Sequence, residues 1–194
     1  MWWYTTGPFS FLPIHAAGIY DNENSERVSD YAVSSYTPIL HVLLTPVSPA
    51  TVTFQMLAII QPETPGYIPL PFTHNELLKI AEHVSEKHLV KLGILKAPAT
   101  LENVISHLLT ASIVHIACHG EQDTENPLES ALILDGGQRL NVSQIMKQKM
   151  PNASLAFLSA CQTAMGDETL SDEAIHLAAS LLFAGFHGVV ATMW

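Results

Sequence analysis

Largely apolar runs alternate with amphipathic segments along most of the chain. The run TFQMLAII at residues 53–60 lies between prolines and is typical of a strand that is buried on both faces. Residues 112–117 (SIVHIA) and 153–161 (ASLAFLSAC) have the same character. An apolar helix predicted at 172–186 precedes a last strand predicted at 187–194. Because strands of this kind occur in parallel sheets, helices must cover both faces.

Helical patterns fill the gaps between these strands. Thr73 and Glu76 have the spacing of a capping box, and the apolar positions that follow predict one helix over residues 74–92. Residues 101–111 form a second amphipathic pattern that leads directly into the next predicted strand. The chain therefore alternates between helix and strand through its central part.

Turn signals divide the remaining segments. The sequence SALILDGGQRL at 130–140 predicts a hairpin that turns at its DGG, and residues 61–72 are proline-rich and predict a connecting loop. The polar segment 21–30 is expected to be an exposed loop. Together these patterns predict an α/β fold, a mostly parallel sheet with helices on both faces, in a single domain over residues 1–194.

Composition changes this picture in two ways. Charged residues make up only 13% of the chain, against a typical value of about 25%, which indicates either that the chain is unusually buried or that it is part of something larger. The net charge of −10 arises from 18 acidic and 8 basic residues, and the basic residues are scattered. Because nucleic-acid binding needs a basic patch, we do not expect nucleic acid as a partner.

Cysteine content and hydropathy indicate where in the cell the protein is located. The chain has two cysteines, and its first residues do not resemble a secretory signal, which predicts a reducing, cytoplasmic location. The longest apolar runs are well short of the roughly 20 residues that span a bilayer, so no membrane segment is expected.

Reactive side chains stand at the ends of two predicted strands. The first strand ends in Cys118-His119-Gly120, and the second ends at Cys161, 42 residues after His119. If the strands are neighbours, His119 and Cys161 face each other across about 5 Å. An imidazolium beside a thiol favours the thiolate, which attacks carbonyl carbons. The backbone N–H groups of Gly120 and Cys161 would then stabilise the oxyanion.

Structural roles compete with this interpretation. A lone cysteine that ends an apolar strand is most often a small buried side chain, and His119 alone could be an ordinary loop histidine. Strand alternation sends Cys118 to the face opposite His119, so we expect Cys118 to pack in the core. His115 lies on the same side as His119 and either orients it or is a hydrogen-bonded core histidine. We favour the core role for His115.

Metal and dinucleotide sites are not expected. Only two cysteines are present and no CxxC pair exists, so a zinc site from His115, Cys118, His119 and Cys161 lacks support. The sequence GFHGVV lacks the GxGxxG pattern and follows a helix instead of a strand. We therefore expect no metal and no organic cofactor.

Four segments of the chain form a recognisable set: VHIACHG, the long segment that begins LAFLSACQTAMGDE, GPFSFLPIHAAGIY and VSDYAVSSYTPIL. Together they resemble the CHAT domain, a caspase-like module related to separase, in the form found in many fungal proteins. The resemblance implies a clan CD cysteine peptidase with His119 as general base and Cys161 as nucleophile. It also implies that this domain, often joined to tetratricopeptide repeats, is incomplete here at both ends.

The resemblance also suggests a substrate pocket. Relatives of this clan commonly cleave after one preferred residue. Where that residue is basic, acidic side chains line the pocket that binds it. Asp167, Asp172 and Glu173 follow Cys161 closely and are candidates for that pocket. A plainer role is equally available, because Asp172 and Glu173 stand at the start of a predicted helix, where acids stabilise the helix dipole.

Three functions remain open from sequence. The first is an endopeptidase that cleaves a protein or peptide substrate through Cys161 and His119. The second is a catalytically silent pseudopeptidase that binds a partner domain or another copy of itself in signalling. The third is that the chain is a structural fragment of a larger parent protein, and that only the parent protein is active.

Overall fold

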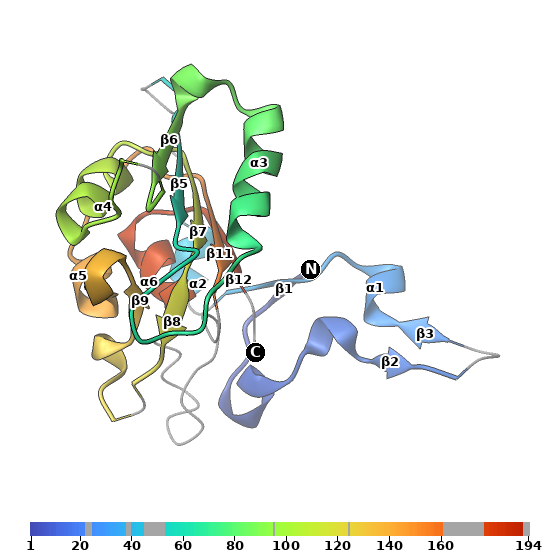
Figure 1. Cartoon of the computed structure of the whole chain (residues 1–194). Coiled ribbons are helices and arrows are strands. Elements are labelled where there is room, and N and C mark those ends of the chain that lie inside the picture. The colour runs from blue at the N-terminus through green and yellow to red at the C-terminus, as the bar shows by residue number, and fades with distance from the viewer. Residues whose placement is uncertain are drawn as a thin grey trace. The chain divides into compact units, whose positions relative to one another are not determined.

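The computed structural model describes residues 1–21, 25–37, 40–44, 53–94, 96–123, 125–160 and 177–191, and they form two compact units. The first unit contains the described residues of Met1–Pro46, and the second contains those of Val47–Met165 and Ile175–Trp194 (Figure 1). Each unit has its own sheets and helices. The second unit holds the strands that lead to the candidate site.

The first unit consists of short elements. Its strands are β1 (Trp2–Trp3), β2 (Gly18–Ile19), β3 (Glu26–Arg27) and β4 (Ser35–Tyr36), and its helices are α1 (Val28–Tyr31) and α2 (Leu40–Leu44). Strand β1 pairs parallel with β4, and β2 pairs antiparallel with β3. The prediction of a loop over 21–30 is wrong in its second half, because β3 and α1 lie there. Asp30 stabilises this turn by accepting a 2.9 Å hydrogen bond from the backbone N–H of Arg27.

A parallel sheet forms the centre of the second unit. Within the described residues it has five strands in the order β12-β11-β7-β5-β6, with parallel pairing throughout. These are β5 (Met56–Ile60), β6 (Leu89–Leu92), β7 (Ile113–Ala117), β11 (Leu155–Ser159) and β12 (Gly188–Ala191). The strand that sequence predicted at 53–60 is therefore confirmed as β5, which lies between β7 and β6 and has every residue buried.

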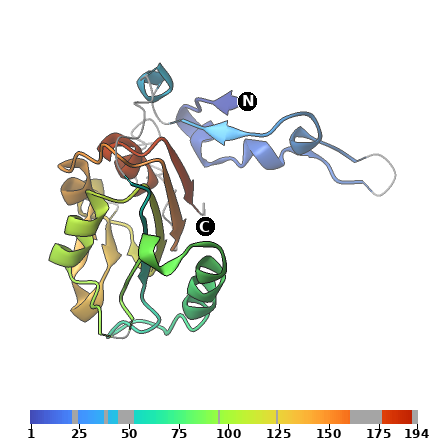
Figure 2. The ribbon, with the colours of Figure 1, turned by 90° about the horizontal axis from the view of Figure 1, so that it is seen from above.

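Helices cover both faces of this sheet. Helix α3 (Thr73–His83) packs on one face, where Leu77 joins Met56 and Ile60 in a small core. The larger core on the other face is formed with α4 (Leu101–Leu108), α5 (Val142–Met146) and α6 (Leu177–Ala184). Figure 2 shows α3 on one side of the sheet and α4 and α5 on the other. The α/β fold with helices on both faces is confirmed.

A smaller antiparallel sheet follows β7. Its strands are β8 (His119–Glu121), β9 (Ala131–Ile133) and β10 (Arg139–Asn141), in the order β10-β9-β8. The predicted hairpin is confirmed by the antiparallel pairing of β9 with β10. Only Cys118 separates β7 from β8, so the chain passes directly from the central sheet into the smaller one.

Short 3-10 helices connect several elements of the two units. They lie at Gly7–Phe11, Ile14–Ala16, Glu86–His88, Pro127–Glu129 and Asp135–Gly137.

Two predictions about the first long helix are wrong. The helix ends at His83, and Leu89–Leu92 form the edge strand β6 beside β5, because pairing with β5 outweighs the helical spacing of these leucines. The capping box is also absent. The Thr73 hydroxyl donates to the carbonyl of Leu70 at 2.8 Å, and Glu76 turns toward the sheet instead.

No helix among the described residues is long and apolar enough to cross a membrane.

Candidate functional site

The two strands that end in candidate catalytic residues are neighbours. Strands β7 and β11 pair parallel, with Ala117 opposite Ser159, so their carboxyl ends lie at the same edge of the sheet. This confirms the adjacency that the dyad hypothesis requires. Cys161 and the acidic residues Asp167, Asp172 and Glu173 lie outside the described residues, so their roles stay predictions.

His119 is held by the proline-rich loop at 61–72. Its Nε2 lies 2.8 Å from the carbonyl oxygen of Ile68, and its ring stacks on Tyr67 with 4.9 Å between ring centroids and 28° between planes. Because a carbonyl can only accept a hydrogen bond, Nε2 carries the proton and donates it. In the neutral ring Nδ1 then holds the lone pair. The loop therefore fixes both the orientation and the tautomer of His119.

A second layer of contacts anchors this loop to the small sheet. The Tyr67 hydroxyl donates to a carboxylate oxygen of Glu121, and the other oxygen of Glu121 pairs with Arg139. The hydrogen bond to the Glu121 carboxylate raises the pKa of Tyr67, because it holds the phenol proton. The same hydrogen bond, helped by Arg139, lowers the pKa of Glu121. The ring that stacks on His119 is thus tied to both β8 and β10.

Sequence reasoning missed Tyr67 and Ile68 as site residues. Both lie about fifty positions before His119, and Ile68 contributes only a backbone carbonyl, which any residue would supply. The available signal was the position of their loop, since it follows β5 and therefore leaves the sheet at its carboxyl edge.

Gly120 occupies the middle of β8 and pairs with Leu132 of β9. The proposed oxyanion role for its N–H stays a prediction.

Cys118 packs in the core, as strand alternation predicted. Its side chain is 1% exposed and belongs to the larger core cluster. The thiol donates to the carbonyl oxygen of His119 at 3.3 Å. Burial raises the pKa of Cys118 to about 12. At neutral pH this residue is therefore a neutral thiol and not a nucleophile.

His115 is a hydrogen-bonded core histidine, as favoured from sequence. It is 7% exposed, and its Nε2 lies 2.7 Å from Oε2 of Glu76 on α3. Its ring stacks on Phe157 of β11 with 5.2 Å between centroids. The other carboxylate oxygen of Glu76 accepts a hydrogen bond from the Ser159 hydroxyl at 3.0 Å. We call the set of Glu76, His115 and Ser159 the Glu76 bridge.

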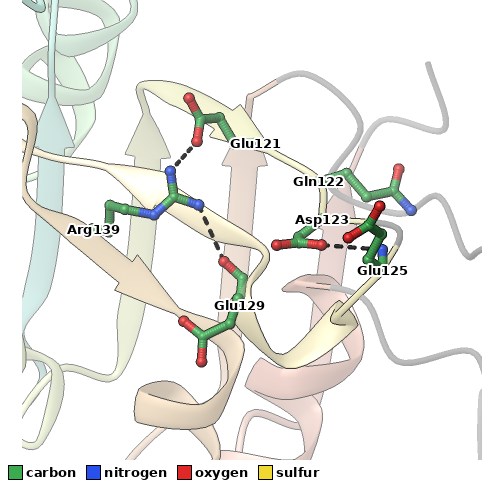
Figure 3. Close-up of a pocket in the computed structure, with 6 residues that line it drawn as sticks. All are labelled: Glu121, Gln122, Asp123, Glu125, Glu129 and Arg139. Atoms are coloured by element: carbon green, nitrogen blue, oxygen red, sulfur yellow. Dashed lines mark hydrogen bonds and ion pairs between the residues drawn. The ribbon is translucent and has the colours of Figure 1, made fainter.

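An acidic hollow of about 680 Å³ lies along β8 (Figure 3). It is lined by Glu121, Gln122, Asp123, Glu125, Glu129 and Arg139. Arg139 spans it, bonded to the Glu121 carboxylate and donating to the backbone carbonyl of Glu129 at 3.1 Å. With four carboxylates and one guanidinium, the hollow has an excess of negative charge. Within the described part of the chain, no group of three His, Cys, Asp or Glu side chains is placed to hold a metal ion.

Comparison with known proteins gives one family. A sequence model described as the CHAT domain matches residues 1–194. The matched range includes both strand-end segments, around His119 and Cys161, as well as the whole first unit. No curated protein matches the chain.

Proposed function

Because the chain belongs to the CHAT domain family, which is related to the caspase-like cysteine peptidases, we propose that it is a cysteine endopeptidase. In this proposal Cys161 is the nucleophile, His119 is the general base, and the substrate is a protein or peptide partner. The observation that carries the proposal is the geometry of His119. His119 stands two residues beyond the carboxyl end of β7, and the Ile68 carbonyl orients its ring through Nε2 and leaves Nδ1 to accept a proton, as a general base requires.

The strand register supports the pairing of this base with Cys161. Ala117 lies opposite Ser159, and His119 and Cys161 each follow two residues later in sequence. Neighbouring strands are about 4.8 Å apart. By sequence count, each reactive residue stands two positions beyond one of these paired residues, and on this basis we propose that His119 and Cys161 share a proton.

The proposed reaction has two stages. First, His119 Nδ1 takes the proton of the Cys161 thiol, and the thiolate attacks the substrate carbonyl carbon to form a C–S bond. The protonated Nδ1 then donates to the leaving amine as the C–N bond breaks, leaving a thioester. In the second stage His119 Nδ1 takes a proton from water, and the resulting hydroxide cleaves the thioester. This releases the acid and returns the proton to the Cys161 sulfur.

Two described groups assist the cationic form of the base. The Ile68 carbonyl accepts from Nε2, and its partial negative charge stabilises the imidazolium. The face of Tyr67 contacts the ring and adds a favourable cation–π interaction. We assign the oxyanion to the N–H groups of Gly120 and Cys161. The reaction needs no metal and no organic cofactor.

For the substrate we propose a preference for a basic residue. Asp167, Asp172 and Glu173 are the proposed pocket residues, and the net charge of −10 favours the approach of a cationic peptide. The acidic hollow along β8 adds negative charge close to the strand that presents His119. We also propose a cytoplasmic location and association with tetratricopeptide-repeat or other domains of a parent protein.

The test is turnover of peptide reporters with arginine, lysine, leucine or aspartate before the scissile bond. We expect cleavage of the basic reporters and its loss in Cys161→Ala and His119→Ala. Cys118→Ala is the matched control, since it removes the other thiol of the chain from a site that takes no part in the reaction. Cleavage that persists in Cys161→Ala would contradict the proposal.

A second candidate is a non-catalytic interaction module. One feature favours it: Phe157 and Val190 lie opposite each other on β11 and β12 and are 41% and 47% exposed, which gives an apolar area on the sheet. A folded protein that cleaves no reporter, and whose Cys161 reacts equally fast with and without His119, would favour this second function.

A further inference from the structure

The Glu76 bridge joins three elements at the edge where the candidate catalytic strands end. Glu76 comes from α3, His115 from β7 and Ser159 from β11. One carboxylate oxygen lies 2.7 Å from His115 Nε2, and the other accepts from Ser159 at 3.0 Å. The His115 side chain is 9% exposed and the Glu76 side chain 33%. Both oxygens of one carboxylate are thus used to hold neighbouring strands.

The bridge is not a serine hydrolase triad, although it has the right residue types. In such a triad the serine hydroxyl bonds to the imidazole, and the imidazole bonds to the acid. Here the acid lies in the middle, and the Ser159 hydroxyl donates to Glu76 instead of His115. The order of contacts is therefore not that of a Ser-His-acid triad.

The location of the bridge gives it a different role. Ser159 is the last residue of β11 and stands two positions before Cys161, while His115 stands four positions before His119. Because Ser159 lies opposite Ala117, its bond to Glu76 fixes the end of β11 relative to the end of β7. Helix α3 supplies the rigid support, and Leu77, the next residue, is buried against the sheet.

We infer that Glu76 is a positioning residue of the proposed peptidase, which holds the end of β11 so that the chain delivers Cys161 at the correct distance from His119. This inference rests on the proposed function. Small displacements of a reacting group are costly, since about 1 Å can change a rate by roughly 100-fold. In this inference the bridge acts through the backbone of β11 and not on the substrate.

The experiment measures the alkylation of Cys161 by iodoacetamide as a function of pH, by mass spectrometry of the two cysteine peptides. We expect Glu76→Gln and Ser159→Ala to lower the rate of Cys161 alkylation near neutral pH by about 10-fold or more and to move its pH profile. Ser159→Thr keeps the hydroxyl and should restore the rate. Glu82→Gln is the matched control, because Glu82 is on the same helix but pairs with Lys79 at the surface.

The outcomes separate this inference from the proposed function. If wild-type Cys161 reacts no faster than Cys161 in His119→Ala, the proposed peptidase is wrong. If the rate depends on His119 but stays at the wild-type value in Ser159→Ala and in folded Glu76→Gln, only the positioning role is wrong. A merely structural bridge would lower the unfolding midpoint of these variants and leave the pH profile of Cys161 unchanged. Ser159→Ala decides the question if Glu76→Gln does not fold.

Discussion

Cys161→Ala leaves Cys118 as the only thiol of the chain, and we expect that thiol to be almost inert in the folded protein. The reason is its place in the core, where it is 1% exposed among apolar side chains. An alkylating reagent needs both access to the sulfur and a thiolate. In the folded protein the sulfur of Cys118 is inaccessible and protonated, whereas unfolding exposes it to solvent and to the reagent.

The magnitude follows from the pKa of the buried thiol. Burial raises the pKa of Cys118 from 9.0 to about 12, so at any pH below 9 the folded protein holds roughly 1000-fold less thiolate than the unfolded chain. We expect alkylation of Cys118 to be slower in the folded protein by at least that factor. The measurement compares iodoacetamide labelling rates in buffer and in concentrated urea at one mildly alkaline pH. Rates that agree within a few-fold would refute the assignment of Cys118 to the core.

The same shift predicts how stability depends on pH. Because the folded-state pKa is the higher one, the folded protein binds the thiol proton more tightly than the unfolded chain does. Its contribution to stability is complete below pH 9, and it is lost as pH rises from 9 toward about 12. The expected loss is about 1.4 kcal/mol per pH unit in this window. Urea unfolding of Cys161→Ala, compared with the variant that also carries Cys118→Ala, isolates this slope.

Two further predictions concern the contacts that hold His119. Tyr67→Ala should lower kcat/KM on a basic peptide reporter by about 3- to 10-fold, since an aromatic stacking contact is worth roughly 0.5–1.5 kcal/mol. Tyr67→Phe keeps the stacked ring and should lower kcat/KM by less. Equal decreases in the two variants would contradict a role for stacking. Glu121 has a lowered folded-state pKa, so its contribution to stability is present above its ordinary value of 4.5 and is lost as pH falls below it. Glu121→Gln should flatten the acid side of the urea-midpoint profile, and an unchanged profile would count against this pairing.

Four of the five described strands of the central sheet could be predicted from sequence because their side chains are largely apolar on both faces. Residues of β5 and β7 face helices on each side, so their runs have no polar alternation that could be mistaken for another structure. The error at Leu89–Leu92 has a physical cause. Leu89 and Leu92 also fit the helical period, and only the presence of β5 beside them decides for a strand.

The candidate site was partly predictable for a related reason. His119 was found because it closely follows a recognisable strand, and Cys118 was assigned to the core because adjacent residues of an extended chain point to opposite faces. Ile68 could not be found, because its contribution is a carbonyl oxygen that carries no side-chain signal. Glu76 was noticed, but as a helix cap. In the structure its hydrogen-bond partners are His115 and Ser159 on two strands of the sheet, 39 and 83 positions away.

The single residue between β7 and β8 has a mechanical consequence. Only Cys118 separates the two strands, and its side chain is buried in the core. The smaller antiparallel sheet therefore cannot change its angle to the central sheet without rotating the backbone at His119. Movement of the smaller sheet would therefore change the backbone orientation of His119, the residue that we propose as the general base.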